Sequence, residues 1–408
     1  MKAKSKHILE EENMWWYYIG QLISLSGLMA RSAVLSLLIM KMVGEKQGSY
    51  YVGLVRSTEF IVGTFIGVFV GIMLDSFDKR RVLQITSSLM ILQAAALALI
   101  TYNGPAHTAM WAIMAVSICG SFTSAVDGIG RNAVIRDALI NKDHAGFGSA
   151  IFTSLYTFAM LAGNGLAGYL VDCVGYSNAF LLNGASFLIL IFSLGRMDFS
   201  HHKIVPNSKN IPHRVAEGMR YTFKDEGIRF CILLSAMITV FGFAYNVLLP
   251  VINQTMFHGD HKQFSYLALC SGVGSLFGAI LALSYGVKRA KEFGMLGSFI
   301  GAAGYILVAC TTNVNYAAVA MFLCGFGFMA SFTPIRGALQ RLAKDGRLNG
   351  VTFGIAFMFF YGGMALSSFA SGWLAEHFGC PKVLIGCGIA IYTVGLLIPI
   401  MPGAKKLN

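Results

Sequence analysis

Residues 71–81 read GIMLDSFDKRR, and they end an apolar run that begins near residue 52. Glycines recur at every fourth position of this run, at Gly63, Gly67 and Gly71. This spacing places them on one face of a helix, where missing side chains let a neighbouring helix approach closely. The basic cluster that follows is typical of the cytoplasmic boundary of a membrane span. The stretch therefore predicts a tightly packed membrane helix with a fixed orientation.

The composition extends this prediction to the whole chain. Of the 408 residues, 56% are hydrophobic and 12% are charged, and the mean hydropathy is +0.64. A soluble domain carries about 25% charged residues, so this chain lacks the polar surface that water requires. The net charge of +12 would suggest nucleic-acid binding in a soluble protein, but basic cytoplasmic loops explain it here. We expect the lipid bilayer as a partner and no nucleic acid.

Twelve apolar runs are long enough to cross a bilayer. A polar interruption separates six of them from the other six, and its second part is expected to form a helix along the membrane surface. We predict an all-α integral membrane protein with twelve transmembrane helices in two six-helix bundles. The predicted units are residues 1–195, a cytoplasmic linker at 196–228, and residues 229–408. The runs lie near residues 15–40, 52–74, 82–102, 107–130, 146–171, 177–195, 229–251, 264–285, 294–311, 315–335, 350–374 and 383–401.

The distribution of lysine and arginine predicts the orientation. With the N-terminus inside, the inner segments hold 25 of the 31 Lys and Arg residues and the outer loops hold four, while Arg31 and Arg56 lie within spans. Inner loops of membrane proteins are enriched in these residues. We therefore expect both termini in the cytoplasm and a multi-pass protein of a bacterial inner membrane.

The two halves of the chain also repeat each other, with a shift of 204 or 205 residues. Basic residues match at the end of the fourth span of each half, and glycines match in the fifth span. Parallel duplication of this kind is typical of secondary transporters with two bundles around a central site. The matched pairs are Arg131 with Arg336, Arg136 with Arg341, and Gly168 with Gly372.

At these residues the chain resembles the major facilitator superfamily. GIMLDSFDKRR is similar to the signature of that superfamily between helices two and three, with Gly71, Asp75, Lys79 and Arg81 on its positions. Asp78 stands where many members have glycine. The resemblance covers essentially the whole chain, and it implies alternating access by rocking of one bundle against the other.

Within the superfamily, the segments that begin at Arg131 and Arg336 look most like drug and siderophore exporters related to the enterobactin and macrolide efflux proteins. That resemblance implies a monomeric exporter of a small molecule, energised by protons and without a cofactor. An importer or uniporter of the same fold, including a metal-ion carrier, stays open as an alternative.

The resemblance also implies a cytoplasmic gate. Asp75 is expected near the start of helix eleven, where a carboxylate can accept from free backbone amides and interact with the helix dipole. Arg131 or Arg136 would add an ion pair to this latch. In the other interpretation the basic residues only set the topology. The gate motif comprises Gly71, Asp75, Lys79, Arg80, Arg81, Arg131, Arg136, Arg336 and Arg341.

Few ionisable residues lie within the spans, where each is costly and marks a candidate functional site. Arg31 and Glu59 fall at similar depths on antiparallel neighbours, and Arg56 precedes Glu59 by three residues on the same helical face. Burial favours a neutral carboxyl group while a nearby arginine favours a charged one, so Glu59 is a candidate proton carrier. A static ion pair is the rival interpretation. Asp127, one turn from Arg131, is a second proton site or an ordinary capping or interface residue.

Amides and aromatic residues are the candidate substrate contacts. Asn164 interrupts a run of small residues in the fifth span, and Asn246 follows Phe243 and Tyr245 in the seventh. We predict that these four residues line the substrate cavity, although a lone membrane amide also commonly binds another helix.

Motifs of catalysis, phosphate binding and metal binding are missing from the sequence. There is no Gly-x4-Gly-Lys loop, no His-Glu-x-x-His and no Gly-x-Ser-x-Gly. His258 and His261 flank an outer loop and are interpreted as surface residues rather than metal ligands. We therefore predict that the protein is not an enzyme and has no metal site.

Overall fold

The computed structural model describes residues 12–74, 77–103, 106–138, 145–197, 211–285, 289–342, 349–401 and 403–404. In these ranges the chain forms helices joined by short turns, and it contains no strand. The helices are α2 (Glu12–Val43), α3 (Glu45–Leu74), α4 (Lys79–Asn103), α5 (Ala106–Ala138), α6 (Ala145–Arg196), α7 (Ile211–Lys224), α8 (Glu226–Gly242), α9 (Ala244–Thr255), α10 (His261–Tyr285), α11 (Ala290–Cys310), α12 (Val314–Leu342), α13 (Asn349–Phe378) and α14 (Cys380–Leu397).

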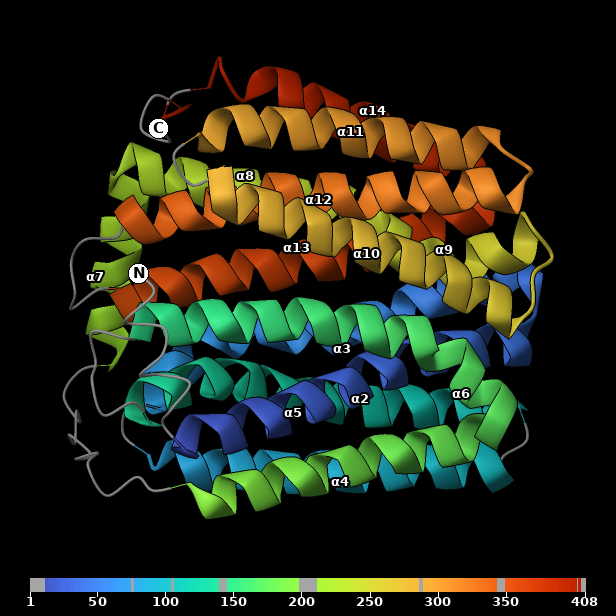
Figure 1. Ribbon diagram of the computed structural model, residues 1–408, viewed down its shortest axis with the longest axis horizontal. Coiled ribbons are helices and arrows are strands. Elements are labelled where there is room, and N and C mark those ends of the chain that lie inside the picture. Colours follow the sequence, from blue (N-terminus) through green and yellow to red (C-terminus); the bar gives the residue numbers. More distant parts are fainter. Residues whose placement is uncertain are drawn as a thin grey trace.

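The predicted twelve-span fold is confirmed. Ten helical segments of the described chain are long and apolar enough to cross a membrane. One of them, Ser154–Arg196, holds two spans, because α6 breaks at Gly175, whose φ of 78° an L side chain rarely adopts. Figure 1 shows the two green parts of α6 running in opposite directions, with α2 between them. The twelfth span is α3, which is 30 residues long and carries ionisable groups near its middle.

The seventh span is made of two helices. It breaks at Phe243 between α8 and α9, where backbone groups lose their helical partners. The hydroxyl of Tyr305 in α11 donates to the Phe241 carbonyl at 2.9 Å and accepts from the Tyr245 amide at 3.0 Å. A broken membrane helix is tolerated where neighbouring groups satisfy the freed backbone in this way. The predicted span 229–251 is therefore interrupted next to the residues that were expected to contact substrate.

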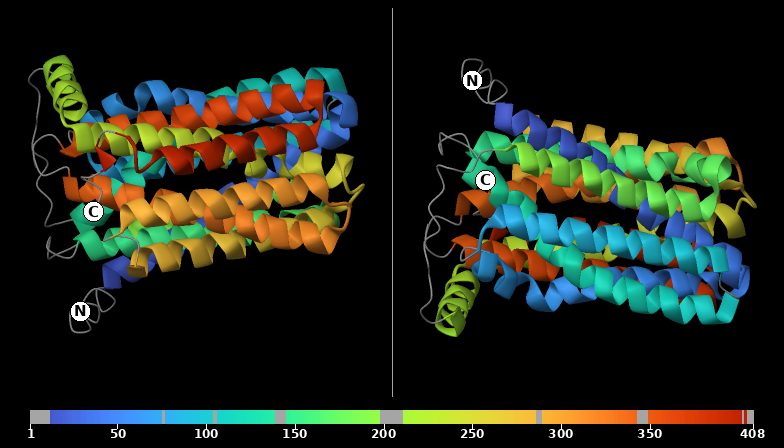
Figure 2. Two further views of the ribbon diagram at one scale, coloured as in Figure 1. Left: turned by 90° about the horizontal axis from the view of Figure 1, so that it is seen from above. Right: turned by 90° about the horizontal axis from the view of Figure 1, so that it is seen from below.

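The two ends of the molecule differ in their elements. The amphipathic helix α7 lies across one end, as expected for a surface helix, and the start of α2 and residue 404 lie at the same end (Figure 1, Figure 2). We call this the α7 end. The opposite end, where α2 gives way to α3 and α9 to α10, is the far end.

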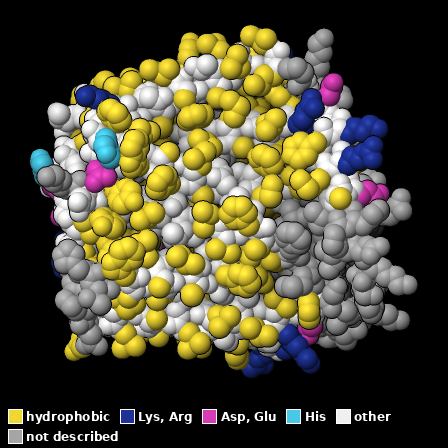
Figure 3. Space-filling model, turned by 180° about the vertical axis from the view of Figure 1, so that it is seen from behind, with side chains coloured by type: hydrophobic (Ala, Val, Ile, Leu, Met, Phe, Trp, Pro, Cys, Tyr) yellow, Lys and Arg dark blue, Asp and Glu magenta, His cyan; other side chains and the backbone are white. Residues whose placement is uncertain are grey.

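The helices form two bundles, α2–α6 and α8–α14. Two helix pairs join them along their length: α3 packs against α13, and α6 packs against α10. The outer surface is rich in exposed apolar side chains, including Phe65, Trp111 and Ile400. Figure 3 shows hydrophobic side chains over the middle of one face, with most of the visible Lys and Arg side chains at the α7 end. This surface suits a lipid environment, because charged groups avoid the hydrocarbon region.

Candidate functional site

A cavity of about 260 Å³ lies between the bundles. A water molecule occupies about 30 Å³ of liquid, so this space is much larger than a packing defect. Residues from the middle of α2 and α3 line it, together with residues near the α7 ends of α5, α6, α10 and α12. The cavity therefore extends from the middle of the molecule toward the α7 end. Its polar and charged lining residues are Arg31, Ser32, Arg56, Glu59, Ser124, Asp127, Arg131, Ser154, Tyr156, Thr157, Asn164, Asn246, Thr333, Arg336 and Tyr361.

Glu59 is held by two arginines and a serine at mid-depth. Its Oε1 lies 3.0 Å from Nη2 of Arg31, and its Oε2 lies 3.3 Å from Nη1 of Arg56. The Ser32 hydroxyl donates to Oε2 at 2.9 Å. The depth argument from the sequence thus placed Arg31, Arg56 and Glu59 together, and the structure brings them together. The side chain of Glu59 is 8% exposed, so its carboxylate is largely shielded from solvent.

The Glu59 cluster also reaches the other bundle. Nη2 of Arg56 donates to Oδ1 of Asn246 in α9 at 3.4 Å. Asn246 is therefore both a cavity residue and a link between the bundles. A change in the charge of Glu59 would act on this link through Arg56.

Asp127 forms a second buried cluster, within the first bundle. It pairs with Nε of Arg131 and accepts from the Thr86 hydroxyl at 3.5 Å. Nη1 of Arg131 donates to the side-chain oxygen of Gln21 and to the Ser24 hydroxyl, the latter at 2.9 Å. Because α2, α4 and α5 supply all of these contacts, this cluster stabilises the packing of one bundle.

The predicted contact residues fall into two groups. Asn164, Phe243 and Asn246 line the cavity, but Tyr245 does not. Tyr245 is 1% exposed and packs edge-on against Tyr305 of α11. Two positions along a helix turn the side chain by about 200°, so Tyr245 faces away from the cavity into its own bundle. The prediction for Tyr245 is therefore wrong.

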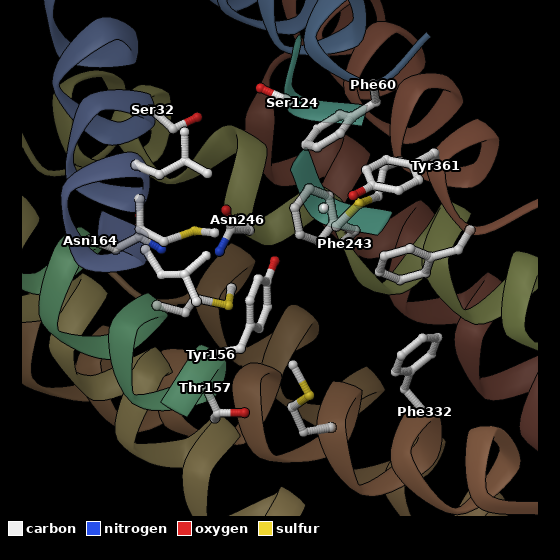
Figure 4. A pocket seen from close by; sticks show the side chains of 18 of the residues that line it. Ser32, Phe60, Ser124, Tyr156, Thr157, Asn164, Phe243, Asn246, Phe332 and Tyr361 are labelled. Carbon is white, nitrogen blue, oxygen red and sulfur yellow. The ribbon is translucent and has the colours of Figure 1, made fainter. Parts of the chain in front are cut away.

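The two amides and several aromatic rings occupy different sides of the cavity (Figure 4). The amides of Asn164 and Asn246 and the hydroxyl of Tyr156 lie on one side. The rings of Phe332 and Tyr361 lie on the other. Sequence analysis missed Tyr156 and Tyr361, because one aromatic residue among many in a membrane helix carries no distinguishing signal.

The predicted gate residues separate in space. Arg336 lines the cavity, whereas Arg341, five residues later in α12, is exposed. Arg131 is engaged by Asp127 instead of standing free for Asp75. Asp75 itself lies outside the described residues, so its latch stays a prediction.

The remaining gate positions lie at the α7 end. Gly71 is in α3 and Arg136 in α5; the side chain of Arg136 is outside the described part. Arg80 donates to the carbonyl oxygen of Gly195 at 2.8 Å, which ties the start of α4 to the end of α6. Lys79 is buried, and Arg81 pairs with Asp78 at 3.5 Å.

At the far end the bundles touch backbone to backbone. A Cβ atom on Gly53 of α3 would lie 2.5 Å from the Ser368 carbonyl oxygen and 2.8 Å from Cα of Gly372 in α13. In the other seam, a Cβ on Gly168 of α6 would collide with the carbonyl of His261 in α10. Gly168 and Gly372 are the glycines that the sequence repeat matched. They thus occupy equivalent places in the two seams that close the far end.

His261 makes polar contacts across the second seam. Its Nδ1 lies 2.7 Å from Oδ1 of Asp172, and its Nε2 lies 2.9 Å from the Tyr176 hydroxyl. The side chain of His261 is 34% exposed, which agrees with the surface position expected of it, but it also joins the two bundles. Its partners lie 85 and 89 residues away in sequence, beyond the reach of any local pattern.

The sequence profile of a family described as "Transmembrane secretion effector" matches residues 9–404. The chain belongs to that family. The family is part of the major facilitator superfamily, so the resemblance seen in the sequence is confirmed. A protein of this family with a central cavity between two bundles is a membrane transporter.

Individual relatives of this protein transport different molecules. It is 26% identical over 275 residues to the "Staphyloferrin A transporter" of Staphylococcus aureus (strain NCTC 8325 / PS 47), covering 67% of each chain. A solved structure of "nucleoside transporter NupG" aligns with a TM-score of 0.68 at 13% identity over 94% of this chain and 98% of that one. A "bacterial homologue of iron transporter ferroportin in inward-facing state" gives a TM-score of 0.70 at 14% identity over the same shares. At these identities the two structures show the shared fold.

Proposed function

We propose that this protein exports a small organic molecule from the cytoplasm by proton antiport with alternating access. The observation that carries the proposal is the Glu59 cluster: a nearly closed carboxylate, held by two arginines, on the wall of the central cavity. An ionisable group at this depth marks an ion or proton pathway. Arg56, which pairs with Glu59, also donates to Asn246, and this contact links the charge of Glu59 to the second bundle.

The orientation that we propose places the α7 end in the cytoplasm. The segments predicted to be inner hold most of the lysine and arginine residues, and the visible basic side chains gather at that end (Figure 3). The cavity would then lie on the cytoplasmic side while the far end is closed. A substrate that enters from the cytoplasm would find the site accessible in this state.

The proposed substrate is a siderophore or a drug-like compound. The curated relative is described as a staphyloferrin A transporter, and the family is described as a secretion effector. Aromatic rings on one side of the cavity and amides on the other suit an organic molecule with apolar and polar faces. Among the described residues no group of three or more His, Cys, Asp or Glu side chains could hold a metal ion, so an organic cargo is favoured over a bare metal ion.

Proton coupling would act through charge at Glu59. When Glu59 is ionised, it holds Arg31 and Arg56 in place. A proton from outside would neutralise it, and Arg56 would then be held by Asn246 and Ser32 alone. This change alters the contact between the bundles at mid-depth, where a rocking motion needs a pivot. Asp127 would remain a structural partner of Arg131.

Inverted membrane vesicles test the proposal. Energised vesicles with the wild-type protein should accumulate a fluorescent substrate dye, and a protonophore should abolish the accumulation. Glu59→Gln keeps the shape of the side chain but not its charge, and it should remove proton-driven accumulation while the protein is still inserted. Glu376→Gln, which changes a carboxylate outside the cavity, is the matched control and should behave like wild type.

Two results would contradict the proposal. Normal, protonophore-sensitive accumulation by Glu59→Gln would contradict the role of Glu59. Accumulation of the dye by intact cells, with none in inverted vesicles, would show an importer.

A further inference from the structure

The cavity has more positive than negative side chains. Four arginines and two carboxylates line it, which leaves a charge of +2 when all six groups are ionised. A membrane interior does not tolerate unpaired charge without a function. The six residues are Arg31, Arg56, Arg131, Arg336, Glu59 and Asp127.

The excess positive charge can be assigned to particular residues. Asp127 balances Arg131 within their own cluster. Glu59 is shared between two arginines, so one of those two positive charges is uncompensated. Buried nitrogens of both arginines also have no hydrogen-bond partner within the described part of the chain: Nε and Nη1 of Arg31, and Nε of Arg56.

The other excess charge is that of Arg336. No acidic side chain of the described chain lies within ion-pair distance of it. Its guanidinium group instead lies 5.5 Å from the centroid of the Phe357 ring, in a cation–π contact. This contact satisfies none of the five N–H donors of the guanidinium group. With respect to the described residues, Arg336 therefore presents a cation with free donors at the cavity wall.

The two excess charges belong to opposite bundles and face the same cavity. Tyr156 lines this cavity together with Arg56 of the first bundle and Arg336 of the second. Tyr361 stacks on Phe357, the ring that Arg336 covers. A ligand beside Tyr156 would thus meet positive charge and a phenol hydroxyl from both sides of the cavity.

We propose that the cavity binds a small organic polyanion whose carboxylate-type groups pair with Arg336 and Arg56. Its body would lie against the aromatic side of the cavity. Arginine is suited to this role because its planar fork binds an oxyanion in a bidentate manner. The proposal rests on the proposed function, since it takes this cavity as the transport route, and it adds the charge of the substrate.

Charge accounting agrees with export. A bound dianion neutralises the excess charge of +2. The substrate-loaded cavity would therefore carry no net charge when it changes from inward-facing to outward-facing. The empty cavity returns with its positive charge toward the negative interior of the cell, and a proton on Glu59 would add to that charge. The membrane potential favours this return step.

Binding to the purified full-length protein in lipid nanodiscs tests the proposal directly. The probe is benzene-1,3,5-tricarboxylate, and its neutral isostere is benzene-1,3,5-tricarboxamide. The tricarboxylate should bind and the tricarboxamide should not. Arg336→Gln should weaken tricarboxylate binding about 10- to 100-fold, the range expected for a lost charge-assisted contact. Arg336→Lys keeps the charge without the bidentate fork. Its affinity for the tricarboxylate should lie between those of the wild type and of Arg336→Gln.

Two controls keep the result interpretable. Arg220→Gln changes an exposed arginine of α7, outside the cavity, and should bind the probe like wild type. The thermal unfolding midpoint of each variant shows whether it folds. If Arg336→Gln folds and still binds the tricarboxylate like Arg220→Gln, the proposal is wrong.

The flux assay separates this proposal from the proposed function. Proton-driven accumulation of the lipophilic cation tetraphenylphosphonium, without tricarboxylate binding, would overturn the polyanion proposal and leave proton-coupled export intact. Tricarboxylate binding without proton-driven flux of any probe would overturn the export proposal and support the anion site.

Discussion

The far half and the α7 half of the seam between α3 and α13 are packed differently, although the same two helices build both. In the far half, Gly53 of α3 and Gly372 of α13 touch so closely that neither position has room for a Cβ atom. In the α7 half, a Cβ on Gly67 of α3 would have the Gly354 carbonyl oxygen of α13 at 4.0 Å, an ordinary contact. The two helices are therefore in close backbone contact at the far end and are packed less tightly toward the α7 end, where the cavity lies.

The second seam has the same asymmetry but different chemistry. Gly168 packs on the backbone of α10 at the far end, and beside it His261 bonds to Asp172 and Tyr176. Toward the α7 end, α6 and α10 both line the cavity. A pair of equivalent seams, tightly packed at one end and lining a cavity toward the other, is the geometry expected of one stage in a rocking cycle.

The largest effect is expected from Gly53→Ala. The added Cβ would meet backbone atoms at 2.5 and 2.8 Å, and overpacking of this kind costs about 1–3 kcal/mol. The state with a closed far end should lose population, and transport in proteoliposomes should fall about 10-fold. Gly386→Ala, at a membrane glycine with open space around it, is the control. Equal transport by the two variants would mean that the α3–α13 seam does not open and close at the far end.

Asp75→Asn tests the state in which the far end is open and the α7 end is closed, and it should have the next largest effect. If Asp75 latches the α7 end when the far end opens, its loss should slow turnover about 3- to 5-fold, as for one charge at a helix terminus. Binding of the substrate should change less than turnover. Asp78→Asn, in the same loop, is the matched control. An unchanged turnover number would contradict the latch.

Asp172→Asn should have a smaller effect at the far end. It removes the negative charge beside His261 but keeps a polar group, and a partly exposed pair of this kind contributes about 0–1 kcal/mol. A cysteine introduced into the cavity should then react about 2- to 5-fold faster with a membrane-impermeant thiol reagent added at the far side. A slower reaction would show that the contact does not hold the seam closed.

Gly67→Ala should have the smallest effect on stability in the state with a closed far end. The added methyl group fits at 4.0 Å, and alanine favours a helix by up to about 1 kcal/mol over glycine. The thermal unfolding midpoint should stay the same or rise slightly. A clear fall would mean that the α7 half is as tightly packed as the far half.

Several parts of this architecture could be predicted from local patterns. Counting residues along antiparallel spans placed Arg31 beside Glu59, because depth in a membrane helix rises by about 1.5 Å per residue. The repeat paired Gly168 with Gly372, and the structure places both glycines in far-end seams. The contact of His261 with Asp172 had no such signal, since it depends on how two spans far apart in sequence are packed.

Helix faces near a break were the least predictable. Phe243, Tyr245 and Asn246 seemed to form one polar and aromatic group, yet Tyr245 faces α11 while its two neighbours face the cavity. Arg336 looked like the counterpart of Arg131, but it has no carboxylate partner among the described residues. The repeat copies the position of a residue and not its surroundings.

By itself the sequence determined the membrane environment, the twelve spans and the division into two similar halves, because apolar length, basic loops and repeated residues are properties of the chain taken segment by segment. Only the tertiary structure decided which end of the interface is closed, which arginines share a carboxylate and which one faces the cavity alone. Those features depend on distances between helices, and side chains far apart in the chain set these distances when they pack.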